Sequence, residues 1–302
     1  MKTAAKVNFF ESGVDWITAT GLGGKQTQQM AEFGVNLLRE SHELGNEYKP
    51  WGMAGFHGFK CGPMQMGQRN HELIIRASSD WAARYWREIY ELADNISRLD
   101  VQATIADDRV PSERIKMHYN QGRCFAARRR NAGALSMYST NDGPSTIYFN
   151  KRISDRFGRI YDKAAESGHE YFRGCVRYEV ELKGDVAKCM AHQLFIASNA
   201  DALAGRHALQ FFADRGLTVA QYLPPLSSAS SGVQDFLTSD RLNPRRSISD
   251  RDRQLKWLSK SVRSTVQKLI TSGRLTDVQE ALGLLSSAQG NATHGPDGPT
   301  SM

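Results

Sequence analysis

Residues 173–184, RGCVRYEVELKG, predict a β-strand with one apolar and one polar face. Successive side chains of a strand point to opposite faces of the sheet. The apolar face holds Val176, Tyr178, Val180 and Leu182, and the polar face holds Arg177, Glu179 and Glu181. We therefore expect one side of this strand to pack on a core, while the other side carries charge.

Two other segments show the same alternation. In SRLDVQATIADD, residues 97–108, the polar face holds Arg98, Asp100, Gln102 and Thr104, and the apolar face holds Leu99, Val101, Ala103 and Ile105. In FGRIYDK, residues 157–163, Arg159, Tyr161 and Lys163 share a face opposite Ile160. If the three strands are neighbours, their polar side chains converge on one patch. The alternative is the ordinary solvated face of a one-sided antiparallel sheet.

The rest of the chain predicts a mixture of strands and helices. Strands are expected at 14–20, 71–77, 133–139 and 144–150, with a strand pair and turns over 49–69. Helices are expected at 25–44, 79–95, 111–122, 185–197 and 201–214. No internal repeat is visible in the sequence. The predicted fold class is α+β: a largely antiparallel sheet with flanking helices, plus a C-terminal helical segment.

The sequence changes character near residue 224. Residues 1–223 predict one domain, and residues 224–249 hold Pro, Ser and Asp without periodicity, which is typical of a linker. Residues 250–285 predict a helical segment, with an apolar stripe that includes Leu255, Leu258 and Val262. Residues 286–302 predict a disordered tail.

Charge and composition narrow the class of partner. The chain has 302 residues, a net charge of +7 and an isoelectric point of about 9.2. An excess of positive charge favours polyanions, because each neutralised phosphate releases counterions. No stretch of about 18 apolar residues and no signal-peptide core is present, so we expect a cytoplasmic protein that does not enter a membrane. The four cysteines lack regular spacing and are expected to be reduced thiols.

The combined polar patch has the parts that phosphoryl transfer needs. Carboxylates can hold a divalent cation, and arginine or lysine can bind the phosphate. A tyrosine hydroxyl is a weak nucleophile at neutral pH because its pKa is near 10. We expect the cations beside Tyr161, namely Arg159 and Lys163, to lower that pKa by favouring the phenolate.

The segment STIYFNKRISDRFGRIYDK, residues 145–163, resembles the replication initiation factor family of rolling-circle initiators and related relaxases. RGCVRYEVELKG resembles the Arg-x-Glu strand of that family, and SRLDVQATIADD resembles its Arg-x-Asp strand. VDWITAT at 14–20 is similar to its opening strand, and RQLKWLSKSVRSTVQKLI at 253–270 is similar to its closing helix. Two positions depart from the family pattern. Asn150 and Lys151 stand where Gly-Ser is usual, and Gln102 stands where a second acidic residue is usual.

The resemblance implies a chemistry and a set of roles. Residues 1–223 would be a nicking domain in which Tyr161 attacks DNA and becomes linked to the 5′ phosphate. Asp100 and Glu179 would hold Mg²⁺ or Mn²⁺, and Glu181 would either assist them or be a solvated edge carboxylate. The DNA-binding side chains would be Arg98, Arg152, Arg159, Lys163 and Arg177.

The implied partners are single-stranded or hairpin origin DNA, a host helicase and a DNA polymerase. No Gly-x-x-x-x-Gly-Lys loop is present, so unwinding would depend on the host. No two histidines are two residues apart, which excludes the His-hydrophobe-His metal strand of other nickases. Two alternatives remain open: a relaxase of a mobile element with the same chemistry, and a DNA-binding replication regulator without catalysis. The sequence predicts no oligomeric state.

Overall fold

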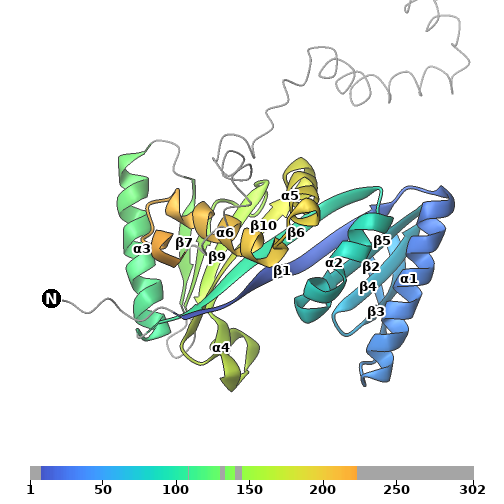
Figure 1. The fold of residues 1–302 in the computed structure, drawn as a ribbon, viewed down its shortest axis with the longest axis horizontal. Helices are drawn as coiled ribbons and strands as arrows, with labels where there is room; N and C mark the ends of the chain where they lie inside the picture. Colours follow the sequence, from blue (N-terminus) through green and yellow to red (C-terminus); the bar gives the residue numbers. More distant parts are fainter. Residues whose placement is uncertain (1–7, 108, 130–132, 140–144, 223–302) are drawn as a thin grey trace, which may run out of the picture. The chain divides into compact units, whose positions relative to one another are not determined.

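An antiparallel sheet with helices packed on it forms the described part of the chain (Figure 1). The computed structural model describes residues 8–107, 109–129, 133–139 and 145–222, which belong to one compact unit. The predicted α+β class is confirmed. The predicted linker, C-terminal helical segment and tail lie outside the described residues, and the 1–223 boundary stays a prediction. No helix in the described ranges is long and apolar enough to cross a membrane.

The strands follow the order β2-β3-β4-β5-β1-β6-β10-β9-β8-β7 across the sheet. Their bounds are β1 Asn8–Gly21, β2 Tyr48–Met53, β3 Phe56–Cys61, β4 Met64–Arg69, β5 Glu72–Ser78, β6 Asn95–Ala106, β7 Leu135–Tyr138, β8 Thr146–Phe149, β9 Arg156–Asp162 and β10 Cys175–Lys183. The α-helices are α1 Gly24–Glu43, α2 Ser79–Leu92, α3 Pro111–Arg128, α4 Lys163–Ser167, α5 Gly184–Ile196 and α6 Ala200–Ala213. Two short 3₁₀ turns are η1 Glu170–Phe172 and η2 Ala220–Tyr222.

The two halves of the sheet repeat one topology. From the centre outward the first half runs β1, β5, β4, β3, β2, and the second half runs β6, β10, β9, β8, β7. Each half has a helix after its central strand, α1 or α3, and another after its last strand, α2 or α5. The last strand of each half, β5 or β10, also ends with the same backbone conformation. The first residue of the helix that follows, Ser79 or Gly184, has a φ of 55°. The structure therefore holds a repeat that the sequence does not reveal.

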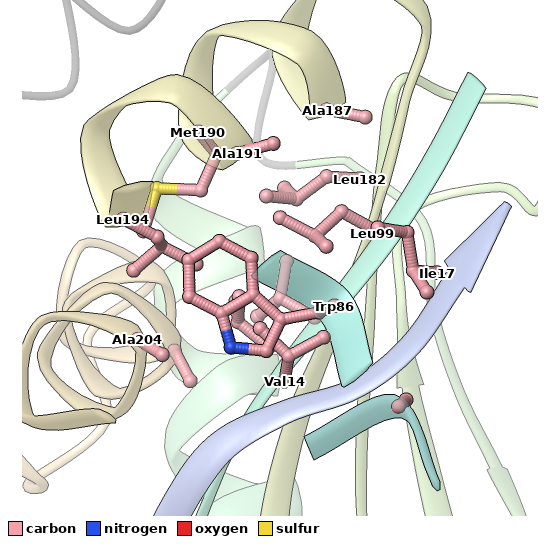
Figure 2. Packing of buried hydrophobic residues seen from close by; sticks show 14 of the residues in the cluster. Val14, Ile17, Trp86, Leu99, Leu182, Ala187, Met190, Ala191, Leu194 and Ala204 are labelled. Atoms are coloured by element: carbon pink, nitrogen blue, oxygen red, sulfur yellow. The ribbon is translucent and has the colours of Figure 1, made fainter. Parts of the chain in front are cut away.

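The apolar side chains of the central strands form the core together with the helices. Leu99 of β6, Leu182 of β10 and Ile17 of β1 are fully buried, and Figure 2 shows them facing Met190 and Leu194 of α5 and Trp86 of α2. The predicted apolar faces of residues 97–108 and 173–184 are thus the core faces. Their polar faces lie on the other side of the sheet, where α4 and η1 are located.

A glycine of β9 makes room for α6. A Cβ at Gly158 would lie 2.4 Å from Cε1 of Phe211 and 2.9 Å from Cε1 of Phe212. We predict that Gly158→Ala costs about 1–3 kcal/mol of stability, because the aromatic rings must shift in a packed core. Thermal or denaturant unfolding measures this cost, and an unchanged midpoint would contradict the packing.

Four details of the predicted elements are wrong. Residues 49–69 form three strands, β2 to β4, instead of a pair. The helix at 111–122 continues to Arg128, and Gly122 is a buried helical residue facing Leu135 and Phe149. The strand at 157–163 ends at Asp162, since Lys163 begins α4 with Asp162 as its cap. The segments α4 and η1 were not predicted, because each is too short to show helical periodicity.

Candidate active site

Strand register brings the three predicted polar faces together. β10 lies between β6 and β9, with Glu181 opposite Asp100 on β6 and Glu179 opposite Arg159 on β9. Arg177 lies opposite Tyr161. The polar side chains of these strands therefore form one patch, as the alternation predicted.

Tyr161 is buried and bonded to a carboxylate. Its side chain is 7% exposed, and its hydroxyl donates a 2.7 Å hydrogen bond to Oε2 of Glu179. Burial raises the pKa of Tyr161 well above its ordinary value of 10.0, and the negative charge of Glu179 raises it further. The prediction that neighbouring cations lower this pKa is therefore wrong: Arg177 acts in that direction, but burial outweighs it.

Asp100 and Glu179 are joined by arginines. The side chains of both carboxylates are almost fully buried, at 1% and 2% exposed. Arg159 pairs with Oε1 of Glu179 and lies 3.3 Å from Oδ2 of Asp100, while Arg98 donates a 2.8 Å hydrogen bond to Oδ1 of Asp100. Burial raises the pKa of both carboxyls, although the arginines act against it.

Glu181 belongs to the same cluster. Its side chain is 2% exposed, and it lies 3.0 Å from Arg98 and 2.9 Å from Lys183. Burial acts to raise the pKa of Glu181, but the hydrogen bond from Lys183 and the charge of Arg98 outweigh it and lower the pKa. Of the two alternatives for Glu181, the solvated edge carboxylate is wrong.

Arg177 has partners that sequence reasoning missed. Its guanidinium pairs with Glu11, lies 2.8 Å from Oδ1 of Asp15 and donates a 3.0 Å hydrogen bond to Thr104. Asp15 reaches it because the β1–β6 register shifts between Val14 and Trp16. Alternation along a regular strand gives no signal for such a shift. Arg177 is only 3% exposed, so its guanidinium is committed to these carboxylates in the structure.

A cavity of about 590 Å³ adjoins this cluster. Its lining includes Asp15, Gln102 and Arg177 from the sheet and Lys163 and Phe172 from α4 and η1. The Lys163 ammonium lies 5.6 Å from the centre of the Phe172 ring and 2.8 Å from Glu166. Lys163 thus faces a space beside the tyrosine strand, although it is not in the strand itself.

Arg152 lies at the other side of the patch. It is exposed, and its guanidinium lies 6.0 Å from the centre of the Phe157 ring, which stacks on Tyr148 at 5.6 Å. Of the five predicted DNA-binding cations, Arg98 and Arg159 are within the carboxylate cluster. Arg152 and Lys163 are at its margins, and Arg177 is buried behind it.

Comparison with known proteins finds a match for the second half of the sheet. Residues 94–218 match the family model described as replication initiation factor. This part of the chain is therefore similar to replication initiation factors. The match includes Asp100, Tyr161 and Glu179, and it confirms the resemblance seen in residues 97–108, 145–163 and 173–184.

A solved structure is also similar, though distantly. It is a rolling circle replication initiator protein from Geobacillus stearothermophilus, with 18% sequence identity and a TM-score of 0.43. The similarity covers 70% of this chain and 98% of that chain. No curated protein matches the sequence.

The carboxylates of the polar patch have the chemistry that a divalent cation requires. Asp100, Glu179 and Glu181 offer oxygen atoms, the ligands that Mg²⁺ and Mn²⁺ prefer. Within the described residues, no three His, Cys, Asp or Glu side chains are arranged around one point. Arg159 contacts both Asp100 and Glu179, so a cation at these oxygens would compete with its guanidinium.

Asp15 makes a pH-dependent contribution to stability. Burial, followed by the charge of Glu179, raises its pKa from 3.8 to about 6. Between these two pH values the folded protein holds a proton that the unfolded chain has released. The stability that Asp15 contributes is therefore complete below pH 3.8 and is lost as the pH rises through about 6. We predict that Asp15→Asn raises the melting temperature relative to wild type more at pH 7.5 than at pH 5. Equal differences at both pH values, measured by calorimetry, would show that Asp15 does not titrate in this way.

Proposed function

We propose that the chain is a site-specific DNA nicking and joining enzyme that initiates rolling-circle replication through Tyr161. The observation that carries this proposal is the 2.7 Å hydrogen bond from the Tyr161 hydroxyl to Glu179, inside a cluster of buried carboxylates and arginines. A carboxylate that already accepts the hydrogen bond is positioned to remove the proton from the nucleophile. The replication initiation factor match of residues 94–218 supports DNA as the substrate.

Tyr161 and Glu179 are the reacting groups of this chain in the proposed reaction, and solvent supplies one proton. The Tyr161 oxygen attacks the scissile phosphorus, and the hydroxyl proton passes to Glu179. The bond between phosphorus and the 3′ oxygen breaks, which leaves a 5′-phosphotyrosine. The 3′ oxygen takes a proton from solvent, Glu179 releases its own, and the free 3′ hydroxyl can prime synthesis. Joining is the reverse of these steps.

Burial prepares Glu179 for this role. Its raised pKa makes the carboxylate a stronger base than a solvated glutamate, so it takes a phenolic proton more readily. Arg159, paired with Glu179, keeps a positive charge next to the position where negative charge develops. Nicking should therefore decline at acidic pH, when Glu179 is protonated.

A divalent cation would complete the site. Asp100 and Glu179 would hold Mg²⁺ or Mn²⁺, with Glu181 as a further oxygen donor. When bound, the cation supplies positive charge to a non-bridging phosphate oxygen. Arg98, Arg152 and Lys163 would bind neighbouring phosphates, while Arg177 would hold Glu11 and Asp15 in place. The partners would be single-stranded or hairpin origin DNA and a host helicase and polymerase.

A covalent-adduct assay tests the proposal. The full chain is incubated with Mg²⁺ or Mn²⁺ and labelled single strands from the replicon that encodes it, and the products are separated under denaturing conditions. We expect a labelled protein band, a DNA product with an extendable 3′ end, and a modified peptide that contains Tyr161. DNA binding without any adduct on the cognate origin would favour the regulator. Adducts formed only on a transfer origin would favour the relaxase.

A further inference from the structure

A row of alternating rings and guanidinium groups crosses the open face of the sheet beside the catalytic cluster. We call it the tryptophan–arginine stack, and its members are Trp51 of β2, Arg76 of β5, Trp16 of β1 and Arg98 of β6. The Arg76 guanidinium lies 4.8 Å from the centre of the Trp16 ring and 5.6 Å from that of Trp51. Arg98 lies 4.6 Å from the Trp16 ring and joins the stack to Asp100.

The sheet is shaped to hold this stack. Gly67 of β4 leaves space for the Trp51 indole, because a Cβ there would lie 2.9 Å from Cζ3 of that ring. Trp51 pairs with Gly58 of β3, so two glycines lie next to the indole. Trp16, Arg76 and Trp51 each keep part of their surface exposed. The members of the stack come from strands between β2 and β6, so it joins the outer part of the first half to the centre of the sheet.

Arg76 lacks an anionic partner among the described residues. It makes no ion pair there, and its Nε is buried without a hydrogen-bond partner. Within the described part of the chain, the Arg76 side chain donates one hydrogen bond, from Nη1 to the Met53 sulfur at 3.4 Å. A guanidinium in this condition is suited to an anion that comes from outside.

The repeated topology shows which residues of this half correspond in position to the proposed catalytic residues. Counting back from the matching strand ends at Ser78 and Lys183, Arg76 corresponds to Glu181, and Ile74 corresponds to Glu179. Through the strand pairing, Thr18 corresponds to Asp100 and Arg69 corresponds to Tyr161. At these positions the first half therefore carries two cations, an apolar side chain and a hydroxyl, where the second half carries carboxylates and the proposed nucleophile.

Charge on this face also favours an anion. Lys60 shares the face with Arg76, because it pairs with Gln65 of β4, which in turn pairs with Arg76. Aromatic rings between cations are typical of surfaces that bind single-stranded nucleic acid, because bases stack on the rings and phosphates bind the cations. A duplex would keep its bases away from the rings, since they are already paired and stacked.

We propose that single-stranded DNA adjoining the nick lies across this face, with bases against Trp16 and Trp51 and a phosphate on Arg76. This inference rests on the proposed function for the position of the nick, but the strand-binding surface is a separate property. It gives the two halves different tasks: one half cuts the strand, and the other holds the flanking segment.

Base stacking is tested with two probes that share one backbone. Fluorescein-labelled oligothymidine and an abasic strand of equal length are titrated with the full chain. Trp51→Ala should bind oligothymidine at least about fivefold more weakly than wild type, which is the low end for one lost stack. Its affinity for the abasic strand should not change, and Trp51→Phe should restore most of the loss.

Matched controls separate the stack from general effects. Phe59→Ala removes an exposed ring from the opposite face of the same strand pair and should leave both affinities unchanged. Arg76→Gln should weaken binding of both probes and reduce the salt dependence, whereas Arg84→Gln on α2 should do neither. Equal binding of oligothymidine by wild type and Trp51→Ala, or equal losses on both probes, would overturn the proposal.

The adduct assay keeps the two proposals distinguishable. At saturating origin DNA, Trp51→Ala should form the Tyr161 adduct at the wild-type rate, with only the DNA concentration for half-maximal rate increased. If wild type forms no adduct while Trp51→Ala still loses oligothymidine binding, the nicking function fails and the strand-binding surface stands. If adducts form and both proteins bind oligothymidine equally, the surface fails and the nicking function stands.

Discussion

Tyr161→Phe is expected to form no covalent protein–DNA adduct and to lose at least about 10⁴-fold in nicking rate, as enzymes do when the nucleophile is removed. The change deletes one oxygen atom and keeps the buried ring. Oxygen Oε2 of Glu179 loses its 2.7 Å hydrogen bond, at a cost of about 1–3 kcal/mol in stability. Binding of single-stranded origin DNA should remain, because the cations of the patch are unchanged.

Tyr178→Phe is the matched control for this experiment. Tyr178 is also a buried tyrosine with a hydrogen bond, 2.8 Å to Nε2 of His118, but it faces the helices. It should lose similar stability and keep its nicking activity. Equal adduct yields from wild type and Tyr161→Phe would show that another group is the nucleophile.

Glu179→Gln is expected to lower the nicking rate by about a hundredfold or more. The amide keeps the shape of the side chain, but it cannot take the proton of Tyr161, and loss of a general base typically costs 10²–10⁴-fold, roughly, in rate. It also removes one of the two proposed metal ligands. Asp100→Asn removes only the other ligand, so its loss should be partly recovered by raising the concentration of Mn²⁺. The measurement is single-turnover nicking at saturating DNA.

The pH profile separates the two roles of Glu179. Asp100→Asn should keep the decline at acidic pH that reflects protonation of Glu179, whereas Glu179→Gln should not. Glu170→Gln, which changes an exposed carboxylate paired with Arg173, should match wild type. Undiminished nicking by Glu179→Gln would remove this residue from both roles, and undiminished nicking by Asp100→Asn would remove the metal assignment.

Side-chain alternation predicted the composition of the polar patch. It works for β6 and β10 because both are regular strands with one face on the core, so Asp100 and Glu179 share a face wherever the strands pair. It fails for Lys163, since the cap formed by Asp162 ends the strand one residue early. It also gives no signal for Asp15, which joins Arg177 through a register shift in β1.

The environment of Tyr161 was not predictable from sequence. The flanking cations indicate a lowered pKa, but the pKa depends on how far the ring is removed from water and on which carboxylate its hydroxyl meets. Arg159 lies next to Tyr161 on the same face, yet it pairs with Glu179 and Asp100 instead. Tertiary packing decides which carboxylates Arg159 pairs with, and the spacing of residues along one strand does not predict it.

The repeated topology of the sheet has a consequence for stoichiometry. A symmetric pair of such halves would place a nucleophile in each, but Arg69 stands at the first-half position that corresponds to Tyr161. On the proposed chemistry, the two sheet halves of one chain thus have one covalent attachment point between them. A reaction that holds two 5′ ends at once would therefore need either the tyrosine of a second molecule or release of the first end before the second is captured.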